Sequence, residues 1–368
     1  MYKNSQILNK TPEYMYLITG AAGFIGFHTS LELLKKNNIV IAVDNINNYY
    51  DRKIKYDRLK ILKQFSKFKF FKIDLNNNKH FSKKISRYKN KIKIIIHLAG
   101  QAGVRYSIIN PSSYITNNIT SYVHLLEFFK DSSKIKLILY ASSSSIYGEV
   151  GSQNSLSSQK QTNPASVYSA SKLSMELISN AYHFLYKKNF IGIRFFSVYG
   201  PWGRPDMFYF KFLKSIRNNK PIKIYNFGNH NRSFTYIDDA VLNIMKIINK
   251  FKNRKNNICD VFNIGNPNSI SLKKFIKVLE NKYGKYVHYY DPSKWTISEN
   301  TTDFAEFELA HKTGDGYGMF IFERIQMPLE TLKKSALNNL RRADPEAYIV
   351  QESRRTVNGV ELLVLITA

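Results

Sequence analysis

Short apolar runs of strand length alternate with longer amphipathic stretches over the first half of the chain. The runs occupy residues 14–19, 38–45, 68–75, 91–100 and 134–143, and stretches with helical spacing lie at 24–37 and 121–130. Parallel strands need a crossover, most often a helix, before the next strand can begin. The alternation therefore predicts an α/β fold with a doubly wound parallel sheet, whose ligands bind outside the carboxyl ends of the strands.

A glycine-rich turn joins the first predicted strand to the first predicted helix. Gly20, Gly23 and Gly26 stand three residues apart in "YMYLITGAAGFIGFH". Without Cβ atoms, such a turn lets backbone N–H groups approach a pyrophosphate at the helix N-terminus. The second strand ends in Asp44, whose carboxylate can accept hydrogen bonds from ribose hydroxyls and so favours NAD over NADP. These features predict a Rossmann-type dinucleotide site, with a turn-forming aspartate as the alternative interpretation of Asp44.

A tyrosine and a lysine share one face of a further predicted helix, "NPASVYSASKLSMELISNAYHFLY". Tyr168 and Lys172 stand four residues apart, a spacing that places two side chains on the same face. An ammonium beside a phenol favours the phenolate and lowers the tyrosine pKa from about 10. Such a tyrosine can remove the proton of a substrate hydroxyl. An ordinary helix face has the same spacing, so the pair is informative only together with the glycine turn and Asp44.

Four serines follow the apolar run "IKLILY" in "YASSSSIYG", although a serine run is typical of a flexible linker. With these motifs, the chain resembles the extended short-chain dehydrogenase/reductases (the NAD-dependent epimerase/dehydratases). Within that family it is most similar to the UDP-glucuronate 4-epimerases. The matching segments run in family order over about residues 14–290. They are "TGAAGFIGFH", "DNINNYYDRKIKYDRL", "HLAGQAGVRYS", "YASSSSIYG", "YSASK", "RFFSVYGPWGRPDM", "RSFTYIDD" and "FNIGN".

The resemblance gives the serine run a role. In this family a hydroxyl residue four positions before the strand-end tyrosine joins the Tyr–Lys pair, and counting back from Tyr147 gives Ser143. The implied catalytic residues are Ser143, Tyr168 and Lys172. Related dehydratases and decarboxylases carry an acidic residue two positions before that tyrosine, where this chain has Ser145. Epimerisation is therefore favoured over elimination or decarboxylation.

The implied reaction inverts C4 of a UDP-sugar. Tyr168 removes the 4-hydroxyl proton while the C4 hydride moves to NAD, Ser143 hydrogen-bonds the developing carbonyl, and Lys172 holds the ribose. The 4-keto sugar turns over in the pocket and takes the hydride back on its other face. Because NAD is regenerated, we expect it to stay tightly bound. The implied conversion is UDP-glucuronate to UDP-galacturonate and back.

The resemblance also implies which residues contact each ligand. For the cofactor they are Gly20, Gly23, Phe24, Ile25, Gly26, Asp44, Asn45, Asp74, Leu75, Leu98, Ala99, Gly100, Asn118, Tyr168 and Lys172. For the substrate they are Arg105, Ser143, Ser197, Arg204 and Arg232. Ser197 and Arg204 would hold the uronate carboxylate, and Arg232 the diphosphate. A structural turn in "GPWGRPD" and a solvated face for Arg204 are the alternatives. Three positions depart from the usual family residues: Gly100 replaces Ala, Ser197 replaces Thr, and Ser233 replaces Asp.

The last 75 residues do not match the family. Residues 294–368 hold nine basic and eleven acidic residues, whereas the whole chain has 55 basic and 27 acidic ones. We therefore expect residues 1–293 to form an NAD-binding epimerase domain with a partial, smaller substrate-binding lobe. Residues 294–368 would form an appended small α+β module. Its predicted elements are strands in "FAEFELAH" and "YGMFIFER", a helix from about Pro328 to Arg342, and a hairpin turning at Asn358-Gly359. His311 and Asp315, without a third partner, indicate turn chemistry.

The bulk composition excludes several other classes. The single cysteine, Cys259, rules out a disulfide framework and a multi-cysteine zinc site. His97 has no partner at ligand spacing, so no metal is predicted. No run reaches the ~18 apolar residues of a membrane span, and the N-terminus has no apolar segment typical of a secretory signal. We therefore expect a cytoplasmic protein. The net charge of +28 comes from lysine spread along the chain, which does not indicate a specific nucleic-acid surface.

Three alternatives stay open at this point. The first is a UDP-glucose 4-epimerase. Enzymes of this class share the core motifs, but their neutral substrate has no carboxylate for Arg204 to bind. An NAD-binding scaffold without turnover is a second alternative, because the usual C-terminal substrate segment is missing. A nucleic-acid binder is the third. The family is often dimeric through the helix that carries "YSASK", so the resemblance also implies a homodimer.

Overall fold

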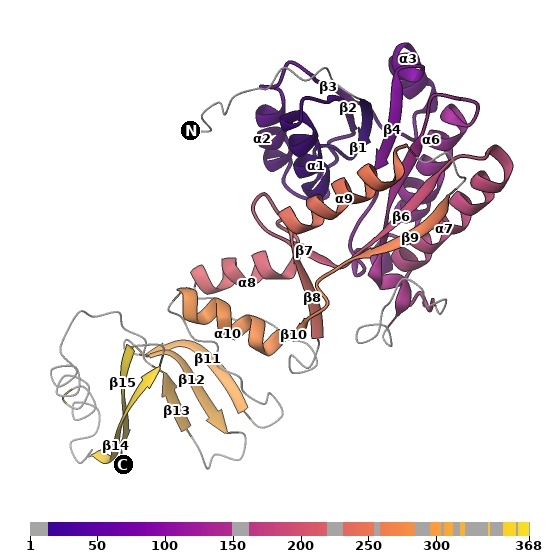
Figure 1. Ribbon diagram of the computed structural model, residues 1–368. Helices are drawn as coiled ribbons and strands as arrows, with labels where there is room; N and C mark the ends of the chain where they lie inside the picture. Colours follow the sequence, from indigo (N-terminus) through magenta and orange to yellow (C-terminus); the bar gives the residue numbers. More distant parts are fainter. Residues whose placement is uncertain are drawn as a thin grey trace. The chain divides into compact units, whose positions relative to one another are not determined.

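A computed structural model describes residues 14–148, 162–218, 231–253, 258–283, 295–302, 305–311, 317–320, 338, 349–357 and 360–367. The chain divides into two compact units, Met1–Phe275 and Ile276–Ala368. The first contains every residue of the predicted site. Figure 1 shows most of its strands side by side in one twisted sheet with helices on both sides.

Seven of the described strands of the first unit form a parallel sheet in the order β3-β2-β1-β4-β5-β6-β9. The strands are β1 Met15–Thr19, β2 Ile39–Asp44, β3 Phe68–Lys72, β4 Ile92–His97, β5 Leu137–Ser143, β6 Phe190–Phe195 and β9 Cys259–Ile264. The order reverses direction between β1 and β4, which is the topological switch point of a Rossmann-type sheet. This confirms the predicted doubly wound α/β fold.

Several of the described helices cover the two faces of the large sheet. The described helices are α1 Phe24–Lys35, α2 Arg52–Leu62, α3 Asn78–Lys89, α4 Tyr106–Ile109, α5 Ser112–Tyr114, α6 Ser121–Phe129, α7 Val167–Tyr186, α8 Phe208–Arg217, α9 Ile237–Phe251 and α10 Leu272–Tyr283. Two short turns complete the set, a π-helical turn η1 Ile115–Thr120 and a 3-10 turn η2 Ser144–Tyr147.

Successive residues of the central strands enter two separate hydrophobic clusters. On β1, Ile18 packs in a cluster with α1 and α9, while its neighbour Leu17 packs in a second cluster with α3, α6 and α7. The same alternation relates Ile94 to Ile95 on β4. Both faces of a parallel sheet are buried in this way because crossover helices cover them. The strands therefore appear in the sequence as continuous apolar runs, without the alternation of apolar and polar residues that marks a half-exposed strand.

A separate three-stranded sheet has the order β10-β8-β7, and its strands do not pair with the large sheet. Its strands are β7 Ser197–Tyr199, β8 Asn231–Tyr236 and β10 Ser269–Ser271. Aromatic rings support it, with Phe234 stacked on Phe275 at 4.6 Å between centroids and Phe208 beside both. This sheet corresponds to the expected smaller lobe, and β7 carries Ser197 into the site.

The second unit contains two antiparallel sheets. One is β11 Trp295–Thr302, β12 Ala305–His311 and β13 Tyr317–Phe320, and the other is the hairpin β14 Ile349–Val357 and β15 Val360–Thr367. The strands predicted in "FAEFELAH" and "YGMFIFER" and the final hairpin are confirmed, whereas β11 was not predicted. The turn Asn358-Gly359, Asp315 and nearly all of the helix predicted near Pro328 lie outside the described residues. The units part within α10, so the boundary near residue 293 stays a prediction.

Two further features bear on the expectations for metals and membranes. Among the described residues, no three His, Cys, Asp or Glu side chains are grouped to hold a metal ion. His97 is instead a core residue whose Nδ1 lies 2.8 Å from the Thr19 hydroxyl and whose ring stacks on Tyr122. None of the described helices is long and apolar enough to cross a bilayer.

Candidate active site

One cavity runs along the carboxyl ends of β1 to β6. Its volume is about 430 Å³, and it extends from the glycine turn to Arg204. Most of the predicted site residues line it: Gly20, Gly23, Phe24, Ile25, Gly26, Asp44, Asn45, Asp74, Leu75, Leu98, Ala99, Gly100, Ser143, Tyr168, Lys172, Ser197 and Arg204. Asn118, Arg105 and Arg232 are not part of its lining. A parallel sheet brings these distant segments together because all its strands end at the same edge.

The glycine turn is packed too tightly to admit side chains at two of its positions. Gly20 has a φ of +71°, and a Cβ there would lie 2.6 Å from the backbone nitrogen of Ala99. A Cβ on Gly26 would collide with the carbonyl oxygen of Gly20. Gly23 caps α1 without any side-chain hydrogen bond. The N–H groups of the first helical turn therefore face the cavity without a side-chain acceptor, an arrangement that suits a pyrophosphate.

Asp44 ends β2 at the wall of the cavity. Its two carboxylate oxygens accept hydrogen bonds from the backbone N–H groups of Ile46, at 2.8 Å, and Ala22, at 3.1 Å. Burial raises the pKa of Asp44, and these N–H groups and the nearby Lys55 ammonium oppose the rise. Each oxygen keeps a lone pair for a further donor, as recognition of ribose hydroxyls requires.

Lys55 belongs to the same wall, and the sequence analysis missed it. Its ammonium donates to the backbone oxygen of Asn47 at 2.9 Å and to the side-chain oxygen of Asn47 at 2.6 Å. Burial lowers the pKa of Lys55, while Asp44 opposes that change. A lysine in a polar helix such as "DRKIKYDRLK" has no distinguishing sequence signal. Only the fold shows that this one points inward.

The end of β3 supplies Asp74, and the loop after β4 supplies Gly100. Asp74 accepts from the side-chain amide of Asn45 at 3.2 Å and from the backbone of Asn76 at 2.9 Å. A Cβ on Gly100 would lie 2.7 Å from the side-chain oxygen of Asn118 and 3.4 Å from the Lys172 nitrogen. The space left by this glycine is therefore already used by two polar side chains.

Asn118 hydrogen-bonds two segments that border the cavity. It lies on the π-helical turn η1, is fully buried, accepts from the backbone N–H of Gln101 at 2.7 Å and donates to the backbone oxygen of Gln101 at 3.1 Å. The same amide donates to the Ser171 hydroxyl at 2.8 Å. Asn118 thus ties the loop after β4 to α7. The cofactor contact predicted for Asn118 remains a prediction.

Helix α7 presents Tyr168 and Lys172 to the cavity. The Ser166 hydroxyl caps the helix by accepting from the backbone N–H of Ser169, which fixes the first turn beside Tyr168. The Lys172 ammonium donates to the backbone oxygen of Ala141 at 2.8 Å. Burial lowers the pKa of Lys172 to about 8. The Tyr168 ring packs edge-on against Tyr114.

The serine run is the end of a buried strand, not a linker. Ser143 closes β5 and is buried at the cavity wall, and residues 144–147 form the turn η2. Its hydroxyl oxygen accepts from the Ser145 N–H at 3.2 Å and from the Ser145 hydroxyl at 2.9 Å. Both lone pairs of Ser143 are therefore occupied, and its own proton remains for an acceptor in the cavity.

A buried ion pair fixes α7 against the sheet behind these residues. Arg194 on β6 binds both oxygens of Glu176 on α7, at 2.9 and 2.7 Å, and both side chains are under 10% exposed. The Ser142 hydroxyl donates to the same carboxylate. Arg194 also donates to the Tyr147 hydroxyl, which donates in turn to Asn263 on β9. No sequence motif indicated this network.

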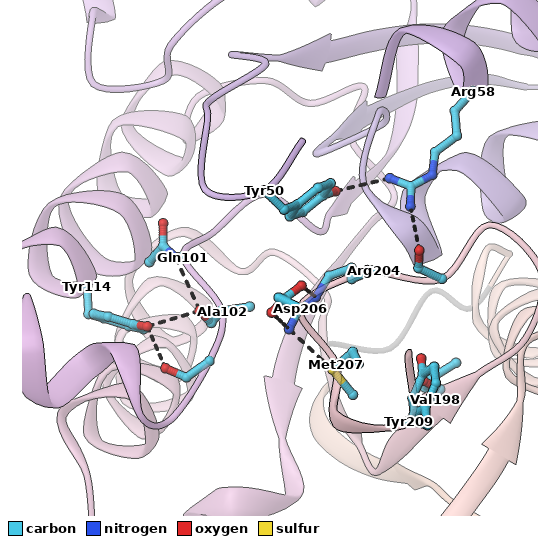
Figure 2. A network of polar contacts seen from close by, with 12 residues as sticks. Tyr50, Arg58, Gln101, Ala102, Tyr114, Val198, Arg204, Asp206, Met207 and Tyr209 are labelled. Carbon is cyan, nitrogen blue, oxygen red and sulfur yellow. Dashed lines mark hydrogen bonds and ion pairs between the residues drawn. The ribbon is translucent and has the colours of Figure 1, made fainter. Parts of the chain in front are cut away.

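Arg204 lies at the far end of the cavity, in the loop after β7. Its guanidinium binds both carboxylate oxygens of Asp206, as Figure 2 shows. Burial alone would lower the pKa of Arg204, but Asp206 and the nearby Tyr168, Tyr49 and Tyr50 rings raise it. The interaction with Tyr168 puts Arg204 within electrostatic reach of the tyrosine predicted to be catalytic.

Arg58 connects the two ends of the site. This fully buried guanidinium donates to the backbone oxygen of Ala22 in the glycine turn at 2.8 Å and to the Tyr50 hydroxyl at 3.0 Å. It also donates to the backbone oxygens of Trp202 and Gly203, just before Arg204. The dinucleotide turn and the Arg204 loop are therefore held by one side chain.

The two remaining arginines lie outside the cavity. Arg105 precedes α4 and is exposed. Arg232 is exposed on β8, where its guanidinium donates to the backbone oxygen of Asn231 at 3.4 Å. The neighbouring Ser233 hydroxyl donates to the backbone oxygen of Asn266 at 2.7 Å. The structure does not bring Arg105 or Arg232 together with the other predicted substrate residues.

Comparisons with known proteins agree with this site. Residues 16–265 match the NAD dependent epimerase/dehydratase family, and the chain belongs to that family. It is 43% identical over 282 residues to Protein CapI of Staphylococcus aureus, covering 73% of this chain and 83% of that protein. It is 42% identical over 271 residues to a UDP-glucuronate 4-epimerase of Thermodesulfobacterium geofontis, covering 73% and 81%.

Solved structures give the same result for the fold. The UDP-glucuronic acid 4-epimerase of Bacillus cereus, in complex with UDP-glucuronic acid and NAD, matches with a TM-score of 0.67 and 34% identity. The match covers 74% of this chain and 84% of that one. The family assignment from the sequence motifs is thereby confirmed.

Proposed function

We propose that this protein is an NAD-dependent epimerase that interconverts UDP-glucuronate and UDP-galacturonate by inverting C4. The observation that carries the proposal is the meeting of Ser143, Tyr168, Lys172 and Arg204 in one cavity. That cavity also contains the glycine turn and Asp44. Relatives about 40% identical are named UDP-glucuronate 4-epimerases, which supports the same substrate.

The residues present fit NAD. The uncapped N-terminus of α1 suits the pyrophosphate, and Asp44 with Lys55 suits the adenine-side ribose. Leu75, Leu98 and Ala99 also line the cavity and provide apolar surface for the cofactor. When bound, NAD would accept the C4 hydrogen of the sugar with its electron pair and later return it.

Tyr168 would move the proton of the 4-hydroxyl group. The Lys172 ammonium, with a pKa of about 8, is mainly charged at neutral pH and lies on the same helix face, one turn after Tyr168. Ser143 would donate its remaining O–H to the C4 oxygen as that oxygen becomes a carbonyl. Both hydrogen bonds of Ser145 to Ser143 hold the serine in that orientation.

Arg204 and Ser197 would hold the uronate carboxylate. A guanidinium binds a carboxylate through two parallel hydrogen bonds, which fixes its plane as well as its position. The 4-keto intermediate is a β-keto acid that loses CO2 readily, so a fixed carboxylate protects it. Ser144 and Ser145 place no acid beside the reacting carbons, which leaves inversion as the outcome.

The deciding experiment uses the full chain without added cofactor. We expect UDP-glucuronate and UDP-galacturonate each to be converted into the same equilibrium mixture, measured by NMR or chromatography, and NAD to be released on denaturation. UDP-glucose under the same conditions is the matched control substrate. Conversion of UDP-glucose instead would identify a UDP-glucose 4-epimerase. Bound NAD without any conversion would identify a non-catalytic scaffold.

Three further expectations are also proposals. The protein would be a homodimer, supported by Leu177, Phe184 and Leu185, which are 63–72% exposed with helical spacing on α7. It would act in the cytoplasm on a soluble UDP-sugar. Residues 294–368 would form a separate module outside the mechanism, and a chain truncated after Ser293 that retains the conversion rate would support that division.

A further inference from the structure

Arg204 already holds a carboxylate of its own chain. Its Nε donates to Oδ1 of Asp206 at 3.1 Å and its Nη2 donates to Oδ2 at 2.9 Å (Figure 2). This paired geometry is the one that a guanidinium offers to a substrate carboxylate. The same edge of Arg204 therefore cannot bind Asp206 and a uronate at once. Under the proposed function, substrate and Asp206 need the same two donors.

Asp206 has a second partner across the cavity wall. The hydroxyl of Tyr49, in the segment after β2, lies near enough to the Asp206 carboxylate for the two groups to interact. Burial and this carboxylate raise the pKa of Tyr49 to about 12, so its hydroxyl stays protonated and remains a donor. The Tyr49 ring is held by packing against Tyr106, with centroids 5.1 Å apart. Tyr49 is thus a fixed donor that Asp206 can keep when Arg204 turns away.

We infer that Asp206 sets how firmly the site holds the substrate uronate, because it competes with that uronate for Arg204 and is retained by Tyr49 when the uronate displaces it. This inference rests on the proposed function and deepens it. It assigns roles to Asp206 and Tyr49, which lie in segments that match the family but were given no role in the sequence analysis. The exchange replaces one carboxylate by another on the same guanidinium, so Arg204 keeps an anionic partner while Asp206 keeps only the neutral Tyr49 hydroxyl.

A neutral sugar cannot drive this exchange. UDP-glucose has a hydroxymethyl group in place of the carboxylate and cannot replace the charge of Asp206. Breaking a partly buried ion pair without replacing the partner is strongly unfavourable. Arg204 therefore stays on Asp206 unless an anion arrives. Competition from Asp206 also keeps the binding of the uronate by Arg204 reversible. Reversible binding lets the keto sugar rotate within the cavity between the two hydride transfers.

Binding measurements on two variants test the inference in opposite directions. Both use the full chain with its NAD in a Tyr168→Phe background, so that the sugar is not converted. Asp206→Asn removes the competitor, and we expect UDP-glucuronate to bind at least about fivefold more tightly, the effect of one unit charge about 4 Å away in water. Tyr49→Phe removes the donor that retains Asp206, and we expect weaker binding of UDP-glucuronate.

UDP-glucose and a distant charge change serve as controls. The affinity for UDP-glucose should change less than about twofold in both variants, because the carboxylate exchange does not involve it. Asp57→Asn makes the same charge change on α2, where Asp57 pairs only with the exposed Lys53. This variant should leave both affinities unchanged. In the Tyr168 enzyme, Asp206→Asn should lower KM and kcat together, because the sugar is held more firmly.

The opposite results overturn the inference. Weaker UDP-glucuronate binding by Asp206→Asn would mean that Asp206 only positions Arg204. Equal changes for both UDP-sugars would mean that the loop itself is disturbed. If the chain without these substitutions does not prefer UDP-glucuronate over UDP-glucose, the proposed function fails. If that preference stands and neither variant alters it, only the exchange fails.

Discussion

The Lys172 ammonium lies 2.8 Å from the backbone oxygen of Ala141 and donates a hydrogen bond to it. Ala141 stands two residues before Ser143 on β5, so this bond joins the helix that carries Tyr168 directly to the strand that carries Ser143. The donor that supports the tyrosine also sets the spacing between the helix and the strand end. Several predictions about catalysis and stability can be derived from this arrangement.

Replacing Lys172 by Met should change how stability depends on pH. Burial lowers the pKa of Lys172 from 10.5 to about 8, so between these values the unfolded chain binds more protons than the folded one. The unfolding free energy of the unmodified protein should therefore rise with pH relative to Lys172→Met, by about 1.4 kcal/mol per unit at most. Urea unfolding of both proteins at pH 7.5 and 9.5 measures this. If the unfolding free energy of the unmodified protein falls with pH relative to Lys172→Met, the pKa of Lys172 is not lowered in the folded chain.

Removing the Ser143 hydroxyl should slow epimerisation with little effect on folding. A donor to a developing oxyanion is worth about 10²–10³ in rate, and we expect a loss of that order in kcat for Ser143→Ala. Ser144→Ala, one residue along the same turn, is the matched control and should stay within about threefold. Initial rates with UDP-glucuronate make the comparison. Equal losses in both variants would show that the turn, and not the hydroxyl, matters.

Breaking the buried pair behind the site should destabilise the first unit. Glu176→Gln leaves the Arg194 charge without its partner, and removing one member of a buried pair costs about 3–5 kcal/mol. Retention of one hydrogen bond by the amide reduces this to about 2 kcal/mol. Glu127→Gln disrupts the exposed pair with Lys130 and should cost less than about 1 kcal/mol. Urea unfolding that ranks the two variants in the reverse order would exclude a structural role for Glu176.

A charge on the exposed face of α7 should prevent dimer formation. Phe184 is 72% exposed, and Phe184→Glu would place a charge in an apolar interface, where it is costly. We expect this variant to elute as a monomer while the unmodified chain is a dimer, measured by light scattering after gel filtration. Leu242→Glu alters an exposed apolar residue on α9 and should leave the dimer intact. A monomeric unmodified chain would refute the proposed dimer.

The strand ends were predictable because each combines an apolar run with a polar residue at its carboxyl end. Asp44 and Ser143 follow this rule, and a parallel sheet necessarily brings such ends to one edge. The role of Ser143 was predicted from the family resemblance, and Tyr168 and Lys172 from their spacing on one helix taken together with the glycine turn and Asp44. Each motif by itself is a short, local stretch of sequence.

The features of the site that the sequence did not predict depend on contacts between distant segments. Glu176 and Arg194 are ordinary charged residues in sequence, and only the fold pairs them out of solvent. Asp206 reads as a turn residue after proline, and its contact with Tyr49 spans more than 150 residues. Arg232 follows the family motif, yet it is exposed on β8. Motif resemblance predicts residue identity, whereas placement depends on the surrounding segments.

The bridge made by Arg58 has a consequence for biosynthesis. Its guanidinium reaches backbone oxygens that are 144 and 145 residues further along the chain. Until the ribosome has released that distant stretch, a cation inside the nascent amino-terminal portion has too few acceptors, which is a costly state. Early co-translational closure of the nucleotide-binding portion around Arg58 is thereby disfavoured until the loop that carries Arg204 has been synthesised.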